Sequence, residues 1–416
     1  MRETNWAGNY TYRAAEIHRP SSLEQVQEIA SRAAELHVLG SRHSFNSMVD
    51  ARELLSLERM PIDLSIDREA GTVSFGAQLA YGELAQSLAQ EGVGLANLAS
   101  LPHICVAGAV ATATHGSGDT NGNLATSVAA LEMVTSEGEV RTATRVDDDF
   151  NGLVVSLGAL GVVTRVTLDI EPDYEVRQRV FNGLGWDAML AHFDEIMSSG
   201  YSVSLFTLWD ESPGSVWVKT RVSDAPELLA EDLFGATSAR TQQHMIAGVD
   251  PANCTPQLGS PGPWSQRLPH FRMGFTPSSG EEIQSEYHVP RRHAVAALDA
   301  VRACSKTIRP LLLVSEIRTV AADELWLSPQ YRQDTVAIHF TWRREQAAVE
   351  RVLVDVEAAL APFEPRPHWG KVFLADAAAL APRYPRLDDF VALLARSDRR
   401  GAFTNAWLRE RVLGNR

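Results

Sequence analysis

Residues 38–46 read VLGSRHSFN, an apolar strand end that runs into a turn rich in small residues. Gly40 and Ser41 let backbone amides crowd an anion, and His43 beside them can contact a cofactor. The turn is too short for the G-x-G-x-x-G dinucleotide fingerprint, and no G-x-x-x-x-G-K-[ST] motif follows in the chain. The stretch therefore predicts a ligand-binding turn outside the common nucleotide motifs.

A second tract of small and nearly uncharged residues follows at 97–118, with the sequence NLASLPHICVAGAVATATHGSG. Backbone without large side chains lets a ligand approach its N–H groups. A buried Ala/Val helix followed by a Gly-rich turn would have the same composition, but the two tracts together favour a cofactor site. Within this tract we expect structural roles for His103 and His115.

Composition limits the function classes. The chain has 416 residues, 45% hydrophobic and 22% charged, which is typical of a globular protein of two domains. Its net charge of -14 argues against nucleic acid or an anionic membrane as partner. The three cysteines have no disulfide or C-x-x-C pattern, the N-terminus lacks a signal peptide, and no apolar run could span a bilayer. We therefore expect a cytoplasmic protein.

Sequence periodicity divides the chain near Pro172. Before it, short strands and helices alternate, with a hairpin that turns at 136–138; after it, longer strands alternate with helices. The elements that we expect are a capped helix at 23–33 after Pro20-Ser21-Ser22, strands at 38–39 and 72–75, a helix at 81–90, a hairpin at 131–143, strands at 201–209, 216–221, 311–320 and 336–342, and helices at 289–303 and 344–361. This texture predicts an α+β fold with a large antiparallel sheet.

Two of these strands place polar side chains on one face. Residues two apart on a strand point the same way, so Glu316 and Arg318 share a face, as do His339 and Thr341. A carboxylate beside a guanidinium is often only a structural ion pair, but Lys371 offers a second cation. Two converging cations suit an alcohol that must lose a proton. We find no metal-ligand spacing and no nucleophile elbow in the sequence.

Several motifs together carry a family resemblance over essentially the whole chain. The two tracts, with LGALGVVT at 157–164, resemble the FAD domain of the vanillyl-alcohol oxidase superfamily. The motifs SEIRT at 315–319, HFTW at 339–342 and RPHWGKVF at 366–373 are similar to those of alditol (xylitol) oxidases. The resemblance implies two domains: an FAD-binding domain at 1–172, a substrate (cap) domain at 173–375 on a large antiparallel sheet, and a segment at 376–416 that returns to the first domain.

The resemblance also implies the cofactor site. It predicts FAD bonded covalently, as 8α-histidyl FAD, through His43. Arg42 stands where the family usually has Gly; if the turn needs a positive φ there, Arg costs on the order of 1 kcal/mol, and its guanidinium could offset this by approaching the pyrophosphate. The residues expected to bind the cofactor are His43, Val38, Leu39, Gly40, Ser41, Arg42, Ser44, Ser100, Cys105, Gly108, Ala111, Thr112, Ala113, Thr114, Val162 and His368.

The activity implied is oxidation of the terminal CH–OH of an acyclic polyol such as xylitol or sorbitol, with hydride passing to flavin N5 and O2 becoming H2O2. The expected catalytic residues are Arg318, Lys371 and Glu316, and substrate would contact Ser100, Glu316, Arg318, His339, Thr341 and Lys371. Ala99 would control the approach of oxygen, and we expect a monomer. Three alternatives remain: an aldonolactone or hydroxy-acid oxidoreductase, a nicotinamide-dependent flavin reductase, and a flavin-binding protein without turnover.

Overall fold

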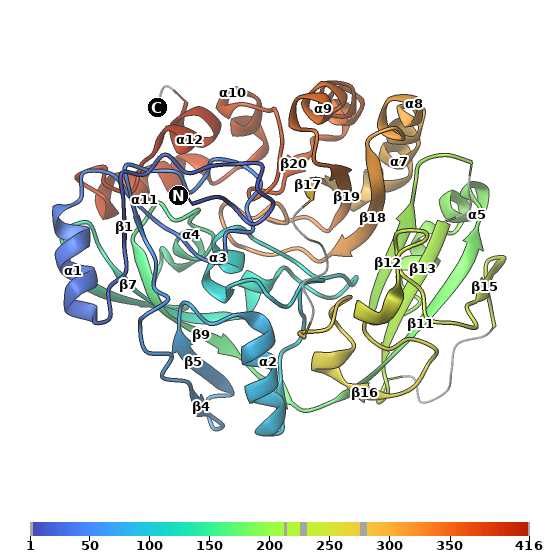
Figure 1. Ribbon diagram of the computed structural model, residues 1–416, viewed down its shortest axis with the longest axis horizontal. Coiled ribbons are helices and arrows are strands. Elements are labelled where there is room, and N and C mark those ends of the chain that lie inside the picture. The colour runs from blue at the N-terminus through green and yellow to red at the C-terminus, as the bar shows by residue number, and fades with distance from the viewer. Residues whose placement is uncertain (1–2, 212–213, 225–230, 275–280, 415–416) are drawn as a thin grey trace.

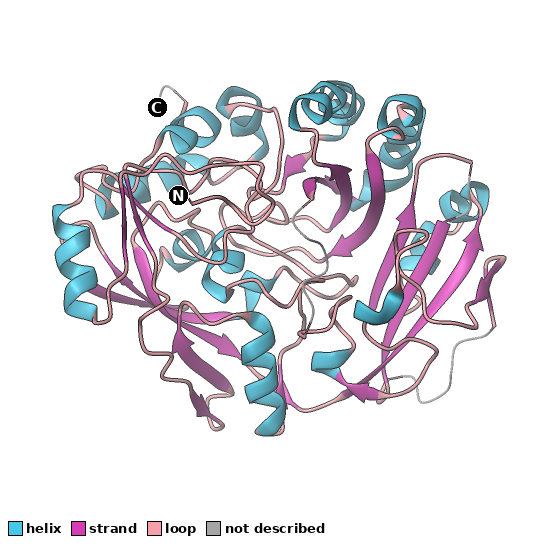
Figure 2. Cartoon of the chain, viewed as in Figure 1, coloured by secondary structure: helices cyan, strands magenta, loops and turns pink. Residues whose placement is uncertain are grey.

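The computed structural model describes residues 3–211, 214–224, 231–274 and 281–414. Figure 1 shows that the N-terminal and C-terminal segments, blue and red, lie together on one side of the molecule, while the strands of a large sheet lie on the other. Figure 2 shows strands in both halves and helices mainly on the outside. One buried apolar cluster includes residues of both halves, such as Leu84 and Trp342.

The first half has three small sheets. A three-stranded parallel sheet has the order β1 (Glu16–His18), β3 (Glu53–Leu55), β2 (Leu36–Val38); a five-stranded antiparallel sheet has the order β4 (Ser65–Asp67), β5 (Thr72–Gly76), β9 (Val162–Asp169), β7 (Val128–Val134), β8 (Val140–Thr144); and β6 (Val93–Gly94) pairs with β10 (Glu171–Pro172). The helices are α1 (Leu23–Arg32), α2 (Tyr81–Gln90), α3 (Val106–Ala111) and α4 (Phe150–Val154).

Local chemistry explains where these elements begin and turn. Ser22 caps α1 because its hydroxyl accepts from the Gln25 N–H, while the Gln25 side chain accepts from the Ser21 N–H. The β7–β8 hairpin turns through Gly138 with φ of +79°, a left-handed conformation that glycine adopts without strain. The predicted helix at 81–90, the capped helix from 23 and this hairpin are confirmed.

The second half is built on one ten-stranded sheet. Its order is β14 (Asp232–Leu233), β15 (Ala236–Ser238), β11 (Glu175–Leu184), β13 (Gly214–Arg221), β12 (Ser202–Thr207), β18 (Leu312–Val320), β19 (Thr335–Arg343), β17 (Glu282–Pro290), β20 (Arg366–Pro367), with β16 (Gly262–Pro263) pairing with β11. Its helices are α5 (Trp186–Ala191), α6 (Phe193–Met197), α7 (Ala294–Ala303), α8 (Ser305–Ile308) and α9 (Gln346–Leu360). All of its strand pairs are antiparallel, so the predicted large antiparallel sheet is confirmed.

One predicted helix begins in the wrong place. Periodicity indicated a helix from Val289, but Val289 and Pro290 end strand β17, and α7 begins only at Ala294. A residue before proline is pushed away from helical angles, which explains why the helix cannot extend back through Pro290. This correction affects function, because it assigns residues 282–290 to a strand that borders the site.

Strand register places the polar residues of the sheet on one face. Glu316 of β18 is opposite His339 of β19, and His339 is in turn opposite Glu286 of β17. Side chains directly opposite each other in an antiparallel sheet lie on the same face. The sequence-based expectation that Glu316, Arg318, His339 and Thr341 share a face agrees with this register, and β17 adds Glu286 to that face.

The last segment contains α10 (Ala377–Leu380), α11 (Leu387–Ser397), α12 (Ala406–Leu408) and a π-helical turn at Arg409–Leu413. It lies against the first half: the Leu36 N–H donates to Ala402 O (2.7 Å), and the Asn405 amide donates to Met48 O and Asp50 O. Figure 1 shows these red helices beside the blue N-terminal strands. These contacts hold the turn that follows β2 between the two ends of the chain.

Candidate active site

A turn follows β2 directly and leads into a large cavity. The Leu39 N–H still donates to Leu55 O of β3, and the Cys105 N–H donates to the Ser41 hydroxyl (3.0 Å), which ties the turn to the start of α3. Arg42 has φ of 64°, so the positive φ considered from the sequence is present. Its guanidinium pairs with Glu3. The guanidinium that we expected to approach the pyrophosphate is thus already paired with Glu3.

His43 lies beside this turn with both ring nitrogens buried and without a hydrogen-bond partner. Its ring stacks on Trp6, with 5.0 Å between ring centroids and 23° between planes. Burial lowers the pKa of His43 to about 4, so the imidazole is neutral at neutral pH. A neutral ring with free nitrogens at a cavity wall has the chemistry of a ligand contact.

The cavity has a volume of about 980 Å³ and runs between the two halves of the molecule. Every predicted cofactor residue lines it except Ala113 and Val162. Val162 has a fully buried side chain, and its strand neighbour Val163 lines the cavity in its place, because successive residues of a strand face opposite sides. An added Cβ at Gly108 would meet nothing within 4 Å, so the backbone there is open to a ligand.

The other wall comes from the large sheet and from residues 368–371. All of the residues predicted to contact substrate line the cavity: Ser100 from the tract of small residues, and Glu316, Arg318, His339, Thr341 and Lys371 from this wall. The Arg318 guanidinium donates to Glu286 Oε1 (2.8 Å) and approaches the Ser100 hydroxyl (3.4 Å). The Lys371 ammonium donates to Glu286 Oε2 (2.5 Å). Both predicted cations therefore bind the same carboxylate.

Glu316 belongs to a different chain of contacts. Its Oε1 lies 2.8 Å from His270 Nε2 and 3.7 Å from Arg318 Nε, and His270 Nδ1 lies 3.1 Å from Lys219 Nζ. Burial by itself would raise the pKa of Glu316, but Arg318 and His270 hold it well below its usual value. Burial lowers the pKa of Lys219 to about 7 and that of His270 to about 4. Glu316 is thus an ionised hydrogen-bond acceptor at the cavity wall.

His368 also borders the cavity. Its Nδ1 accepts from the Gly370 N–H (3.1 Å), which leaves Nε2 as the protonated nitrogen, 3.5 Å from the Thr114 hydroxyl. Burial lowers the pKa of His339, on the same wall, to about 3. Both rings are therefore neutral, and the charges on this wall are those of the carboxylates and the cations.

Comparisons with known proteins agree with this geometry. Residues 14–144 match the FAD binding domain family, and residues 278–411 match the D-arabinono-1,4-lactone oxidase family. The chain is 50% identical to an alditol oxidase of a Streptomyces species over 99% of both chains. It belongs to the alditol oxidase family.

Relatives of this oxidase family extend the picture. An L-gulono-1,4-lactone dehydrogenase of Mycobacterium tuberculosis is 29% identical over 99% of both chains. Among solved structures, cholesterol oxidase from B. sterolicum superposes with a TM-score of 0.77 at 15% identity, over 98% of this chain and 96% of that one, which shows the fold alone. The fold is that of the vanillyl-alcohol oxidase type, as the sequence resemblance implied.

The residues fit the family's cofactor. FAD needs a turn with exposed amides, a bare tract for close approach and a wide cavity, and these are present at 39–44, at 99–115 and between the two halves. His43 lines that same cavity. FAD is therefore the cofactor of this alditol oxidase family member. In the described residues, no helix is long and apolar enough to cross a membrane.

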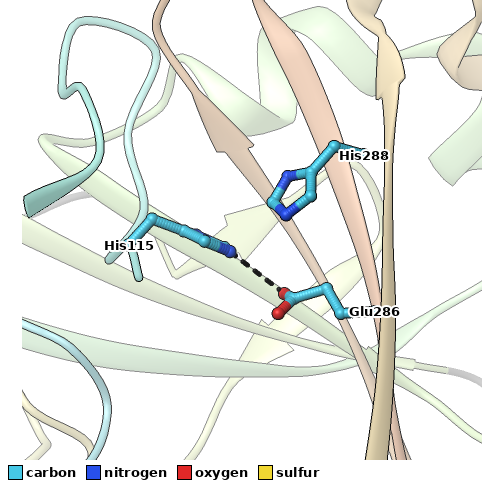
Figure 3. A group of neighbouring side chains, drawn as sticks. All are labelled: His115, Glu286 and His288. Atoms are coloured by element: carbon cyan, nitrogen blue, oxygen red, sulfur yellow. Dashed lines mark ion pairs between the residues drawn. The ribbon is translucent and has the colours of Figure 1, made fainter. Parts of the chain in front are cut away.

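Sequence reasoning missed three charged or titratable residues of the site. Glu286 lies on a strand that was taken partly for a helix, although EIQSEYHV at 282–289 alternates between the two faces and could have revealed it. Lys219 and His270 have no such signal, because Lys219 contacts His270 across 51 residues of sequence and His270 contacts Glu316 across 46. Figure 3 shows His115, also expected to be structural, pointing at Glu286 beside His288.

Proposed function

We propose that the chain oxidises the terminal CH–OH of an acyclic polyol such as xylitol or sorbitol to the aldose, with O2 reduced to H2O2. The observation that carries this proposal is the balance of charge at the site. Arg318 and Lys371 are matched by Glu286 and Glu316, and hydroxyl and imidazole groups surround them. A neutral substrate with many hydroxyls suits such a wall, since each buried hydroxyl needs a partner. The 50% identical relative is an alditol oxidase.

The protein's own residues have separate tasks in this reaction. Bound FAD supplies the redox chemistry, with flavin N5 as hydride acceptor and O2 as the final electron acceptor. Arg318 and Lys371 stabilise negative charge on the reacting hydroxyl oxygen as its proton leaves for solvent, and this proton and the hydride together balance the two hydrogens of H2O2. The carboxylate of Glu316 accepts hydrogen bonds from substrate hydroxyls, and the remaining hydroxyls are held by Ser100, His339 and Thr341. Ala99 borders the cavity next to Ser100, where it controls the approach of oxygen.

We infer further that FAD is bonded covalently to His43, as 8α-histidyl FAD. The neutral ring, free at both nitrogens, supports this linkage. His43→Ala should bind flavin that acid denaturation releases, whereas the wild-type protein should retain it after the same treatment. His103→Ala is the matched control, because His103 also lines the cavity but its Nε2 lies 2.8 Å from Met273 O. Flavin that stays attached in His43→Ala would assign the bond to another residue.

A second candidate function has one specific observation in its favour. The match of residues 278–411 to the D-arabinono-1,4-lactone oxidase family favours an aldonolactone or hydroxy acid as substrate. A carboxylate substrate would be repelled by the ionised Glu316, which lies at the same wall as the cations. Glu316 therefore favours the polyol over the hydroxy acid.

The deciding experiment is anaerobic mixing of the purified flavoprotein with xylitol or sorbitol while flavin absorbance is followed, and then admission of air with an assay for H2O2. Bleaching followed by recolouring with peroxide is the expected result. No bleaching by either polyol, with bleaching by a lactone, a hydroxy acid or NADPH, would assign one of the alternative functions.

We also propose that the protein acts as a monomer in the cytoplasm. The support for the cytoplasm is the pattern of three cysteines, all of which are free thiols in the structure. Sedimentation equilibrium should return the mass of one chain, 45.6 kDa plus FAD, and a dimer mass would contradict the proposal.

A further inference from the structure

Glu286 sits at the centre of the site with no exposed side-chain surface. Oε1 lies 2.8 Å from Arg318 Nη2, and Oε2 lies 2.5 Å from Lys371 Nζ. One carboxylate therefore bridges the two cations that, in the proposed function, contact the reacting hydroxyl of the substrate. His115 Nε2 lies 3.2 Å from the same carboxylate, and Figure 3 marks this contact with a dashed line.

Glu316, the other carboxylate of this wall, does not bridge the two cations. Glu316 lies 3.7 Å from Arg318 Nε and accepts its short contact from His270. Lys371 has its short ion pair with Glu286. Removing Glu286 would leave two buried cations side by side, which is strongly unfavourable. Burial lowers the pKa of Lys371 and Arg318 adds to this, while Glu286 opposes both.

The same carboxylate belongs to a group that resembles a metal site, formed with His115 and His288. The hydrogen bonds of His288 argue against its binding a metal. His288 Nδ1 faces the Gln330 Nε2 amide (2.9 Å), and Asn123 donates to Gln330 Oε1, which fixes the direction of that amide. His288 Nδ1 is thus the acceptor, and its Nε2 keeps the proton that a metal ligand would have to lose.

Charge gives the second argument against a metal. Both oxygens of Glu286 already face a cation, and a divalent ion would have to enter beside Arg318 and Lys371. The group is better explained by the two side-chain cations than by an ion.

We propose that Glu286 is a positioning residue of the reaction: its two oxygens aim Arg318 and Lys371 at one substrate oxygen and keep the Lys371 ammonium charged. This inference rests on the proposed function for the identity of the step, but the pairing itself can be tested without turnover. Glu286 touches the two cations and acts through them, so its loss affects the oxidation step more than substrate binding.

The first test is a double-mutant cycle in thermal stability of the flavin-loaded protein. We expect Glu286→Gln to lower Tm, because it leaves two unmatched cations, and Lys371→Met in the same chain to restore part of the loss. Strictly additive Tm changes would overturn the pairing. This test needs no substrate, so its result is independent of the proposed function. If the Tm changes are non-additive but no polyol reduces the flavin of the wild-type protein, the proposed function is rejected and the pairing of Glu286 with the two cations is kept.

The second test follows anaerobic flavin reduction by xylitol from pH 6 to pH 9. Glu286→Gln should lower the limiting rate by about 100-fold at high pH, with partial recovery toward pH 6 as Lys371 regains its proton, and with a smaller change in substrate affinity. Glu324→Gln, the same change at an exposed ion pair with Arg332 that does not line the cavity, is the control and should keep the wild-type profile. A Glu286→Gln profile parallel to that of wild type would overturn the proposal.

The third test separates positioning from folding. Glu286→Ala should regain part of its reduction rate when formate or acetate is added, because the small carboxylate can enter the space between the two cations. Failure of rescue in a variant that is folded and holds flavin would contradict the proposal. Dialysis of the wild-type protein against EDTA should change neither Tm nor rate. One tightly bound metal per chain that is absent from Glu286→Gln would assign the group to a metal instead.

Discussion

Arg42 has a backbone conformation that is unfavourable for any residue with a Cβ atom. It adopts φ of 64° in the turn beside His43, and its exposed guanidinium pairs with Glu3. A left-handed conformation costs a non-glycine residue about 1–2 kcal/mol, while an exposed ion pair returns about 0.5 kcal/mol. The turn therefore keeps its shape because neighbouring contacts hold it, including the Trp6 N–H that donates to Arg42 O (2.8 Å).

Replacing Arg42 with glycine isolates this strain. Arg42→Gly and Arg42→Ala both remove the ion pair with Glu3, but only glycine relieves the backbone. We expect Arg42→Gly to have the higher free energy of unfolding by about 0.5–1 kcal/mol, since the greater freedom of unfolded glycine offsets part of the gain. Denaturant titration of the two variants measures the difference. Equal stability would mean that the turn relaxes when the side chain is shortened.

Lys219 gives a residue-scale prediction about pH. Its ammonium is fully buried, and its contact with His270 Nδ1 leaves His270 Nε2–H to donate to Glu316. Because burial lowers the pKa of Lys219 to about 7, the positive charge behind Glu316 is lost as pH rises through neutrality. We expect KM for xylitol to rise roughly 2- to 5-fold between pH 6 and pH 8, corresponding to about 0.4–1 kcal/mol.

The control for this prediction is Lys219→Met, which keeps the length of the side chain without the charge. Its KM should be raised at pH 6 and should stay flat to pH 8, when measured as steady-state oxygen consumption. A KM transition near pH 7 that persists in Lys219→Met would assign the titration to another group.

At the scale of elements, the β7–β8 turn and helix α1 stabilise each other. The Gln27 amide donates to Gly138 O (2.7 Å), and a Cβ added at Gly138 would lie 2.9 Å from Gln27 O. Gly92 has a similar φ, +70° against +79°, but a Cβ there would meet nothing within 4 Å. The two glycines therefore separate backbone strain from a steric clash between elements.

We expect Gly92→Ala to lower the free energy of unfolding by about 1 kcal/mol, from strain alone. Gly138→Ala should lower it by about 2–3 kcal/mol, because α1 must also move away from the turn. Urea unfolding of both variants provides the comparison. If the two losses are equal, α1 is not held against the hairpin in solution.

The sequence predicts those elements that short-range patterns of residues encode. Glu316 and Arg318 were placed on one face because strand periodicity alone determines it, and the register with His339 agrees. Glu286 was missed because Pro290 and the helix after it made the end of its strand look helical. The contact of Lys219 with His270 depends on how a sheet and a loop pack together, which no local pattern encodes.

At the scale of the whole molecule, the active site is formed between the halves rather than within one of them. The first half provides the turn with His43 and the tract of small residues, and the large sheet provides the charged wall. Backbone contacts join the two at the cavity: the His270 N–H donates to Ser100 O (3.0 Å), and the Gly118 N–H donates to Thr319 O (2.9 Å). Burial of the site is therefore a property of the assembled chain, and so are the pKa values that burial shifts.

Those shifts predict how stability depends on pH. Burial lowers the pKa of His37 and His270 to about 4 and that of His339 to about 3, against about 6.5 in an unfolded chain. Above about pH 7.5 these rings are neutral in both states and contribute no pH dependence. As pH falls below 6.5, the three rings become protonated in the unfolded chain but stay neutral in the folded protein. The free energy of unfolding therefore decreases progressively until the pH reaches the folded pKa values. Between about pH 5.5 and pH 4.5 the three rings together should lower the free energy of unfolding by roughly 4 kcal/mol per pH unit.

Denaturant unfolding followed by tryptophan fluorescence at pH 7, 6, 5.5, 5 and 4.5 measures this slope. His37→Gln is the control, because an amide N–H can replace the ring in the contact with Phe403 O (2.8 Å) but does not titrate. Its slope should be smaller by up to 1.4 kcal/mol per pH unit, the value for one proton. A free energy of unfolding that stays constant from pH 7 to pH 5 would mean that these histidines gain their protons without unfolding, through water that enters the space between the halves.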